Sequence, residues 1–355
     1  MTARQIPVRY CRALIISGLM LVCTGCGRDA PVEDTPAIDA TESVPVVVYS
    51  TYGAEVVKPV FDAYTEETGL RVYLLTGSYE HLTGKVHQPG SDPVADLFIA
   101  DNVADLWRAA EQDVFRPTRS DVIAKRVPAQ LRDPEHLWTA LGVRARVIAY
   151  NTQLVDAAEI GSVSDYASLG AEDFRDRLCL SSSTVAANVS LIAMLINDNG
   201  IRDAEVIVRG WRANLATSGY DGDHDLLQAI AAGQCALGVA DSSEVARFLG
   251  ANAGSNLAAH WFQDPGVTHI NASGGGVTRH AKNAAGAVSL LHWLTSESAN
   301  ALFVLSLLEF PANAGAVTPD AIAAWSGFEA NPVNLSGLGY LQEDASKLAD
   351  RARYP

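Results

Sequence analysis

Hydrophobic and polar residues along the chain follow two different periods in turn. Residues 44–49 form a β-branched run that predicts a strand, with the paired part starting after Pro45 because proline has no N–H to donate. Apolar side chains between Val56 and Tyr64 then recur at the spacing of one helical face, and Gly69 ends that helix. Residues 70–75 predict a second strand. A strand, a helix and a strand in this order predict a parallel βαβ unit.

The same alternation continues over the rest of the chain. It predicts strands at 95–100, 137–150, 177–180 and 235–239, and helices at 103–110, 189–196, 226–232, 284–294 and 298–307. Repeated strand–helix alternation is typical of an α/β fold with helices on both faces of a sheet. A body that starts near Val44 is long enough for two lobes. We therefore expect a three-layered α/β architecture that is duplicated in two lobes.

Ligands of open α/β sheets bind outside the carboxyl ends of the strands, where loops lead into helices. This rule selects loops at residues 50–53, 77–79, 101–102, 181–184, 241–244 and 273–276, all rich in hydroxyls, glycine or carboxylates. None of these loops pairs a nucleophile with a base. The chain has neither a Gly-x-Ser-x-Gly elbow nor a His-Glu-x-x-His zinc motif. The sequence therefore favours a binding protein without a catalytic cofactor over an enzyme.

The first 43 residues indicate export. Arg4, Arg9 and Arg12 precede an apolar run at 13–22, which has the length of a signal-peptide core and is too short to span a bilayer. The run ends in Cys-Thr-Gly-Cys, which resembles a bacterial lipobox. We expect a signal peptide at 1–25 and a lipid on Cys26, with an ordinary signal peptide cut near Gly25 as the alternative. Residues 26–43 lack large apolar side chains and predict a disordered tether.

Charge and cysteine content narrow the choice of partners. The formal net charge of −15 argues against nucleic acid and an anionic membrane surface, and it is compatible with a cationic ligand. Beyond the export segment the cysteines are Cys179 and Cys235, each within an apolar run that predicts a strand. Pairing them would bridge neighbouring strands of one lobe, as an exported protein permits. Two buried free thiols are the alternative.

Several collinear segments resemble a known family. They include Val48-Tyr49-Ser50-Thr51, Pro93-Val94-Ala95-Asp96-Leu97, Arg144-Ala145-Arg146-Val147-Ile148-Ala149-Tyr150-Asn151 and His269-Ile270-Asn271-Ala272-Ser273-Gly274. The chain is similar to the periplasmic ferric-iron-binding proteins of ABC importers, especially their cyanobacterial branch. The resemblance implies a Venus-flytrap fold with crossover strands at the hinge, an N-terminal lobe at 44–140 plus 270–312, and a C-terminal lobe at 141–269 plus 313–355. It also implies a lipid-anchored monomer in the periplasm or at the cell surface, which delivers a ligand to an importer permease.

The resemblance implies a metal site whose ligands have changed. Family members bind Fe(III) through tyrosinates, helped by a histidine or a carboxylate, because hard oxygen donors suit a hard trivalent cation. Tyr150 matches one family tyrosine. Ser243 and Glu244 stand where the family has a tyrosine pair, and Gly53 and Ala54 replace a histidine and a tyrosine.

Two interpretations of the ligand follow. In one, a rebuilt site holds ferric iron through Tyr150, Glu244, Tyr52 and Asp101 or Asp241. In the other, the cleft holds an organic or phosphorylated anion on Ser182, Ser183, Thr184, Asp241 and Ser243; an anion bound with the metal fits both. Each residue also has a structural alternative: Tyr150 as a packing residue of the hinge strand, Ser243 and Glu244 as a helix start, and Asp101 as a helix cap. A signalling or scaffold lipoprotein that transports nothing is the rival from another class.

Overall fold

The structure is a computed structural model that describes residues 44–88, 90 and 93–355. The expected signal peptide at 1–25, the lipidated Cys26 and the tether at 26–43 lie outside these residues. Among the described helices, none combines the length and the apolar character needed to cross a bilayer.

The strands are short except for two that connect the two halves of the described body. They are β1 (Val46–Ser50), β2 (Val72–Thr76), β3 (Leu97–Ala100), β4 (Thr139–Asn151), β5 (Leu178–Cys179), β6 (Leu237–Asp241), β7 (Leu257–His260), β8 (Ile270–Val277) and β9 (Phe310–Pro311).

Helices alternate with these strands, as the periodicity predicts. They are α1 (Ala54–Thr68), α2 (Tyr79–His87), α3 (Val103–Glu111), α4 (Asp121–Arg126), α5 (Ala157–Gly161), α6 (Ala186–Ala213), α7 (Asp223–Ala231), α8 (Ser242–Ala251), α9 (Ala284–Leu294), α10 (Glu297–Leu307), α11 (Asp320–Ala323), α12 (Leu335–Gly339) and α13 (Gln342–Ala352). Short 3-10 turns lie at Ala129–Leu131, Ala167–Gly170 and Glu172–Phe174.

The helix α1 illustrates how local sequence produces these elements. Its buried residues Val57, Val60, Phe61 and Tyr64 lie on one face and pack on the sheet. Gly69 caps the helix in the left-handed conformation (φ 73°), which glycine adopts without steric cost, and its N–H donates to the carbonyl of Thr65.

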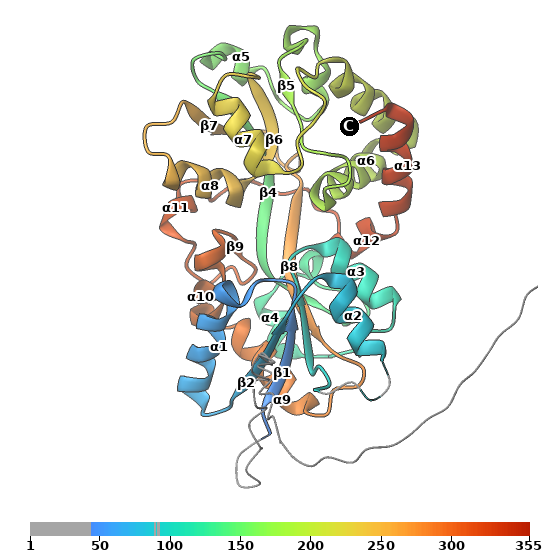
Figure 1. The fold of residues 1–355 in the computed structure, drawn as a ribbon, viewed down its shortest axis with the longest axis vertical. Coiled ribbons are helices and arrows are strands. Elements are labelled where there is room, and N and C mark those ends of the chain that lie inside the picture. The colour runs from blue at the N-terminus through green and yellow to red at the C-terminus, as the bar shows by residue number, and fades with distance from the viewer. Residues whose placement is uncertain (1–43, 89, 91–92) are drawn as a thin grey trace, which may run out of the picture. The chain divides into compact units, whose positions relative to one another are not determined.

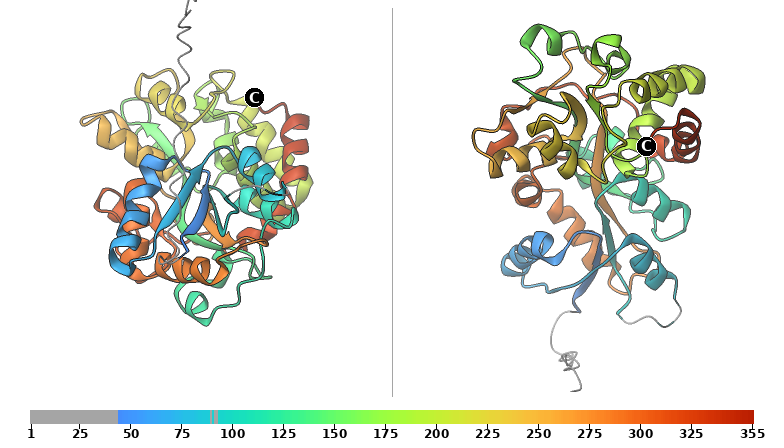
Figure 2. Two further views of the ribbon diagram at one scale, coloured as in Figure 1. Left: turned by 60° about the horizontal axis from the view of Figure 1, so that its bottom comes forward. Right: turned by 45° about the horizontal axis from the view of Figure 1, so that its top comes forward.

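Two groups of strands make up two lobes. In the first lobe the order is β2-β1-β3-β8-β4, with β1 parallel to β2 and β3, and β8 antiparallel to β3 and β4. In the second lobe β4 pairs antiparallel with β6 and β7, and β5 lies parallel to β6. Figure 1 shows β4 and β8 running between the two groups, and the views in Figure 2 agree. The α/β fold class and its crossover strands are confirmed.

The strand β4 changes partners in its middle. Arg144 and Ala145 pair with Asn271 and Ile270 of β8, whereas the next residue, Arg146, pairs with Asp241 of β6. The change of partner strand therefore falls between Ala145 and Arg146. The β4 residues before Arg146 pair with the first lobe, and those from Arg146 onward pair with the second. Side chains near residue 145 therefore lie at the junction of the lobes.

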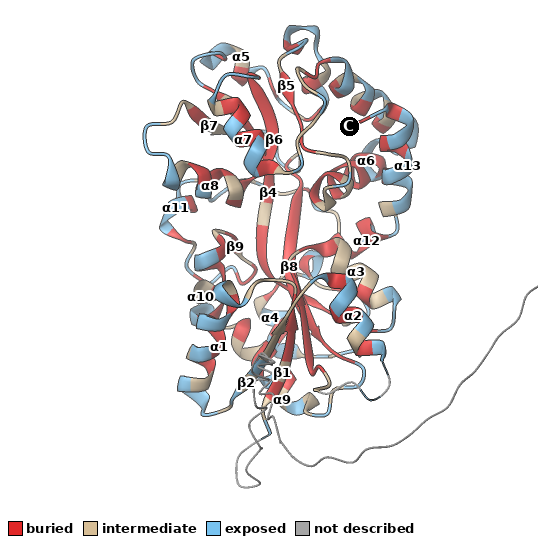
Figure 3. Cartoon of the chain, viewed as in Figure 1, coloured by how far each residue is buried: buried red, intermediate tan, exposed pale blue. Residues whose placement is uncertain are grey.

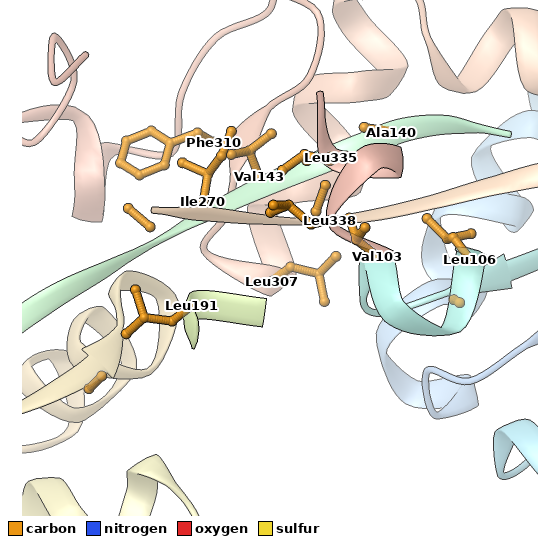
Figure 4. Close-up of a cluster of buried hydrophobic side chains, with 14 of the residues drawn as sticks. Val103, Leu106, Ala140, Val143, Leu191, Ile270, Leu307, Phe310, Leu335 and Leu338 are labelled. Atoms are coloured by element: carbon orange, nitrogen blue, oxygen red, sulfur yellow. The ribbon is translucent and has the colours of Figure 1, made fainter. Parts of the chain in front are cut away.

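The strands are buried in both lobes, while the helices bury one side and expose the other (Figure 3). Apolar side chains also fill the junction. Val143 of β4, Ile270 of β8 and Phe310 of β9 lie close to Leu335 and Leu338 of α12 in Figure 4, and all of them are buried. This packing holds the crossover strands in register and so fixes where the polar residues of the junction point.

Candidate functional site

A hydrogen-bonded group of polar side chains lies at the junction of the lobes. We call Tyr52, Arg144, Asp241, Ser273 and Glu309 the junction network. Its members come from five places in the fold: the loop after β1, β4, the end of β6, β8 and the residue before β9. Segments far apart in the sequence therefore converge at one point.

Arg144 connects the two carboxylates of the network. Its Nε donates to Oδ2 of Asp241 at 3.0 Å, and its Nη1 donates to Oε1 of Glu309 at 2.8 Å. Burial disfavours the charged guanidinium, but the carboxylates of Asp241 and Glu309 outweigh this and hold the pKa of Arg144 well above its ordinary value. Arg144 is therefore a fixed positive charge that links the second lobe to the first.

Glu309 is the most enclosed acid of the network. Only 2% of its surface is exposed, and its Oε1 also accepts a hydrogen bond from the Tyr52 hydroxyl at 3.1 Å. Its Oε2 accepts from Ser273 Oγ at 2.6 Å. Burial, and then the negative charge of Glu309, raise the pKa of Tyr52 well above its ordinary value, so the tyrosine is a neutral phenol at neutral pH.

A second cluster surrounds Arg146 inside the second lobe. The guanidinium is fully buried and donates through Nη1 to Asp223 at 2.5 Å and to Asp241 at 3.2 Å, and through Nη2 to Asn188 at 2.6 Å. Burial alone would raise the pKa of Asp241, but Arg146 and Arg144 together lower it. Asp241 is thus an ionised carboxylate shared by both arginines.

Two buried hydrogen-bond donors at the junction have no partner among the described residues. Asn271 is fully buried and stands opposite Arg144 in the β4–β8 ladder. Its Oδ1 accepts from the N–H groups of Val103 and Ala272, while its Nδ2 has no hydrogen-bond partner among the described residues. The Nε of Arg146 is in the same condition.

The expected metal ligands are only partly brought together. Tyr52 joins the network directly, and Asp101 accepts from the hydroxyl of Thr51, the neighbour of Tyr52, at 3.1 Å. Tyr150 pairs with Leu237 and Ala258, six residues beyond Arg144 and therefore roughly 20 Å further along β4. The register of β4 thus separates Tyr150 from the other candidates.

The α8 candidates divide between its surface and its core. Glu244 lies in the first turn of α8 and is partly exposed, with its Oε1 3.4 Å from Nε of Arg247. Ser243 is buried. In the part of the chain that the structure describes, no group of three or more His, Cys, Asp and Glu side chains is arranged to hold a metal ion. A metal at the junction would therefore need the phenol of Tyr52 or oxygens from outside the chain.

The backbone N–H groups of the expected anion loop, residues 182–184, donate hydrogen bonds to other groups of the chain. The N–H of Ser182 donates to the carbonyl of Tyr220 at 2.6 Å, that of Ser183 to the carbonyl of Pro355 at 2.5 Å, and that of Thr184 to Ser182 Oγ at 3.2 Å. The neighbouring residue Ser181 reaches the Arg146 cluster instead, through a hydrogen bond from its hydroxyl to Asp223. This geometry does not favour an anion on the loop in the form that the structure describes.

The two cysteines of the second lobe form a disulfide. Cys179 of β5 and Cys235, just before β6, have their Cα atoms 5.9 Å apart and their sulfurs bonded. The bond joins neighbouring parallel strands, as the pairing alternative required.

Sequence reasoning missed Glu309, Ser273 and Asp223 as members of the two clusters. Ser273 belongs to one of the loops that strand ends select, so a signal existed for it. Arg144 and Arg146 lie within a segment that resembles the family, and their sequence context alone does not predict the two clusters. Nothing around Glu309 in the sequence indicates its role.

Known proteins are similar in sequence to most of the chain. Residues 60–330 match the model of a family described as bacterial extracellular solute-binding protein. Iron uptake protein A1 of Synechocystis is 29% identical over 346 residues, which cover 96% of this chain and 94% of the relative. The Fe(3+)-binding periplasmic protein of Serratia marcescens is 25% identical, with coverage of 82% of this chain and 86% of that protein.

Two solved structures of iron-uptake relatives have a similar fold. A Trichodesmium protein (IdiA, FutA) in complex with iron and citrate ligands superimposes with a TM-score of 0.83 at 31% identity, over 88% of this chain and 100% of that one. Apo FutA2 from Synechocystis gives 0.81 at 26% identity, with the same coverage of both chains. The similarity covers both lobes and the strands that join them.

Proposed function

Because the chain belongs to the bacterial extracellular solute-binding protein family, we propose that it captures ferric iron outside the cytoplasm and delivers it to an ABC importer. It is a binding protein and not an enzyme, in agreement with the relatives named for iron uptake. The support for iron comes from relatives that match over nearly their whole length and from the oxygen donors at the junction.

The observation that carries this proposal is the arrangement of Tyr52, Glu309 and Asp241 around Arg144 at the junction of the lobes. A phenol and carboxylates are hard oxygen donors, which suit a trivalent cation. Because they come from different lobes, a cation among them would favour the closed arrangement of the lobes. Tyr150 stands far from these donors and acts in this proposal as a packing residue of β4.

The test is a titration of the purified mature protein with ferric citrate, followed by visible absorption and calorimetry. Tyrosinate bound to ferric iron gives a coloured band, so the wild type should become coloured and Tyr52→Phe should lose the band. Tyr150→Phe should keep it, as should Tyr73→Phe, a control on an exposed residue of β2. A wild-type protein that stays colourless and releases no heat would refute the proposal.

An anionic ligand is the second candidate, and the unpartnered donors of Asn271 and Arg146 favour it. Donors of this kind suit an oxygen of a carboxylate or a phosphate. Calorimetry with citrate alone, without iron, separates the two ligands. Heat with citrate but none on later addition of iron would favour the anion.

The location and partners extend the proposal. The family places the chain outside the cytoplasm, and the Cys-Thr-Gly-Cys segment supports a lipid on Cys26. We infer that the protein works as a lipid-anchored monomer that docks on a permease when its lobes are closed. Membrane fractionation tests the anchor, because Cys26→Ser should release the protein into the soluble fraction.

A further inference from the structure

Glu309 occupies a place that the fold prepares for a carboxylate. Its partners Tyr52, Ser273 and Arg144 come from the loop after β1, from β8 and from β4. The strand β4 has a register shift between Ala140 and Gly142 at this point. A Cβ on Gly142 would lie 2.0 Å from Oε2 of Glu309, so any other residue there would push the carboxylate aside. A buried charge needs such partners, because burial without them is costly.

Arg144 supplies the positive charge that the two carboxylates require. It lies between Asp241 and Glu309, with 12% of its side chain exposed. Coulomb attraction grows with charge, so a trivalent cation at the same place attracts the carboxylates more strongly than a guanidinium does. For a divalent cation the advantage in attraction over the guanidinium of Arg144 is smaller.

Asn271, the ladder partner of Arg144, adds an unpartnered hydrogen-bond donor next to the network. It is fully buried beside Arg144 in the ladder, and its Nδ2 has no hydrogen-bond partner among the described residues. Buried donors are normally paired, so this one suits an oxygen that a bound ligand brings with it.

We propose that Glu309 is a ligand of the metal cargo and that Arg144 is the counter-charge that the cargo replaces. The inference rests on the proposed function, since it takes the cargo to be ferric iron. When the cation binds, Glu309 and Asp241 exchange their contacts with Arg144 for contacts with the metal, and Asp241 keeps its contact with Arg146. Arg144 then acts as a competitor that every cation must displace, and a cation of lower charge recovers less of that cost from the carboxylates.

The test compares ferric affinities, measured by competition with a chelator, for the wild type, Glu309→Gln and Arg144→Met. Glu309→Gln keeps the size of the side chain and removes its charge, so the ferric affinity should fall by at least roughly 10- to 100-fold, because changing a group that only supports a metal ligand already costs that much. Arg144→Met removes the competitor, so the affinities for Fe(III) and Mn(II) should both rise. Asp62→Asn, on the exposed face of α1, is the matched control and should change nothing.

Gly142→Ala is a further variant that leaves every charge in place and pushes the carboxylate of Glu309 aside. It should weaken ferric binding as Glu309→Gln does, and urea unfolding of each variant shows that it is folded. Unchanged affinity in Glu309→Gln and Gly142→Ala would overturn the inference, as would weaker ferric binding in Arg144→Met. A wild type that binds no ferric iron overturns the proposed function as well, whereas a wild type that binds it normally beside an unaffected Glu309→Gln overturns this inference alone.

Discussion

Removal of the disulfide should weaken the second lobe by an amount that its position in the chain determines. Cys179 and Cys235 are 56 residues apart in the sequence, and both are buried. A bond over this separation restricts the unfolded chain, which in the loop-entropy treatment stabilises the fold by about 4 kcal/mol at room temperature. Cys179→Ala combined with Cys235→Ala should lower the free energy of unfolding by this amount.

The corresponding change in melting temperature is modest because the body is large. The entropy of unfolding scales with length, so a loss of about 4 kcal/mol corresponds to a shift of about 6 °C for a body of roughly 300 residues. If the second lobe unfolds separately from the first, the loss is confined to its transition and the shift there is larger.

Urea unfolding followed by tryptophan fluorescence and far-UV circular dichroism measures this loss. Trp211 is buried in the second lobe and reports on it. The oxidised wild type, the wild type with a reductant and the double alanine variant should be compared, and the last two should unfold at the same lower urea concentration. A reduced wild type within about 1 kcal/mol of the oxidised protein would refute the loop-entropy argument, since native disulfides of this kind typically contribute 2–4 kcal/mol.

Two further predictions concern buried ionisable groups of the second lobe. Arg146→Met leaves Asp223 buried without its guanidinium and Asp241 with Arg144 alone, and it should cost about 3–5 kcal/mol in urea unfolding. Arg209→Met at an exposed pair should cost at most about 1 kcal/mol, and equal losses would contradict the role of Arg146. Burial, and then the charge of Arg146, lower the pKa of His269 from 6.5 to about 3, although Asp241 opposes this. Between these values the unfolded chain binds a proton at His269 that the folded protein does not. The free energy of unfolding should therefore fall as the pH drops below 6.5, by up to about 1.4 kcal/mol per pH unit. His269→Gln should flatten this dependence, and an unchanged slope would refute it.

The secondary structure could be predicted from the sequence to a large extent. The first βαβ unit, the helix end at Gly69 and the strand before Asp241 all appear close to their expected places. These features depend on periodicity and on the conformations that single residues allow, so neighbouring residues are sufficient to determine them. The family resemblance added the crossover strands, which the structure shows as β4 and β8.

The candidate site could be predicted only in part. The rule that ligands bind at strand ends selected the loops of Tyr52, Asp101 and Asp241, and the structure brings Tyr52 and Asp241 to the junction network. The motif around Tyr150 indicated a ligand, but the register of β4 carries this residue along the second-lobe sheet and away from the network. Glu309 has no local signal, because its role depends on the space left by Gly142 and on partners that are distant in the chain.

The sequence alone determined the kinds of element, their order and the two cysteines that were able to pair, since each depends on residues close together in the chain. The tertiary structure decided which polar side chains meet. Two long strands cross between the lobes, and a shift of one residue in their pairing would turn every side chain to the other face. Packing of Val143, Ile270 and Phe310 holds that register and so places Arg144 between Asp241 and Glu309.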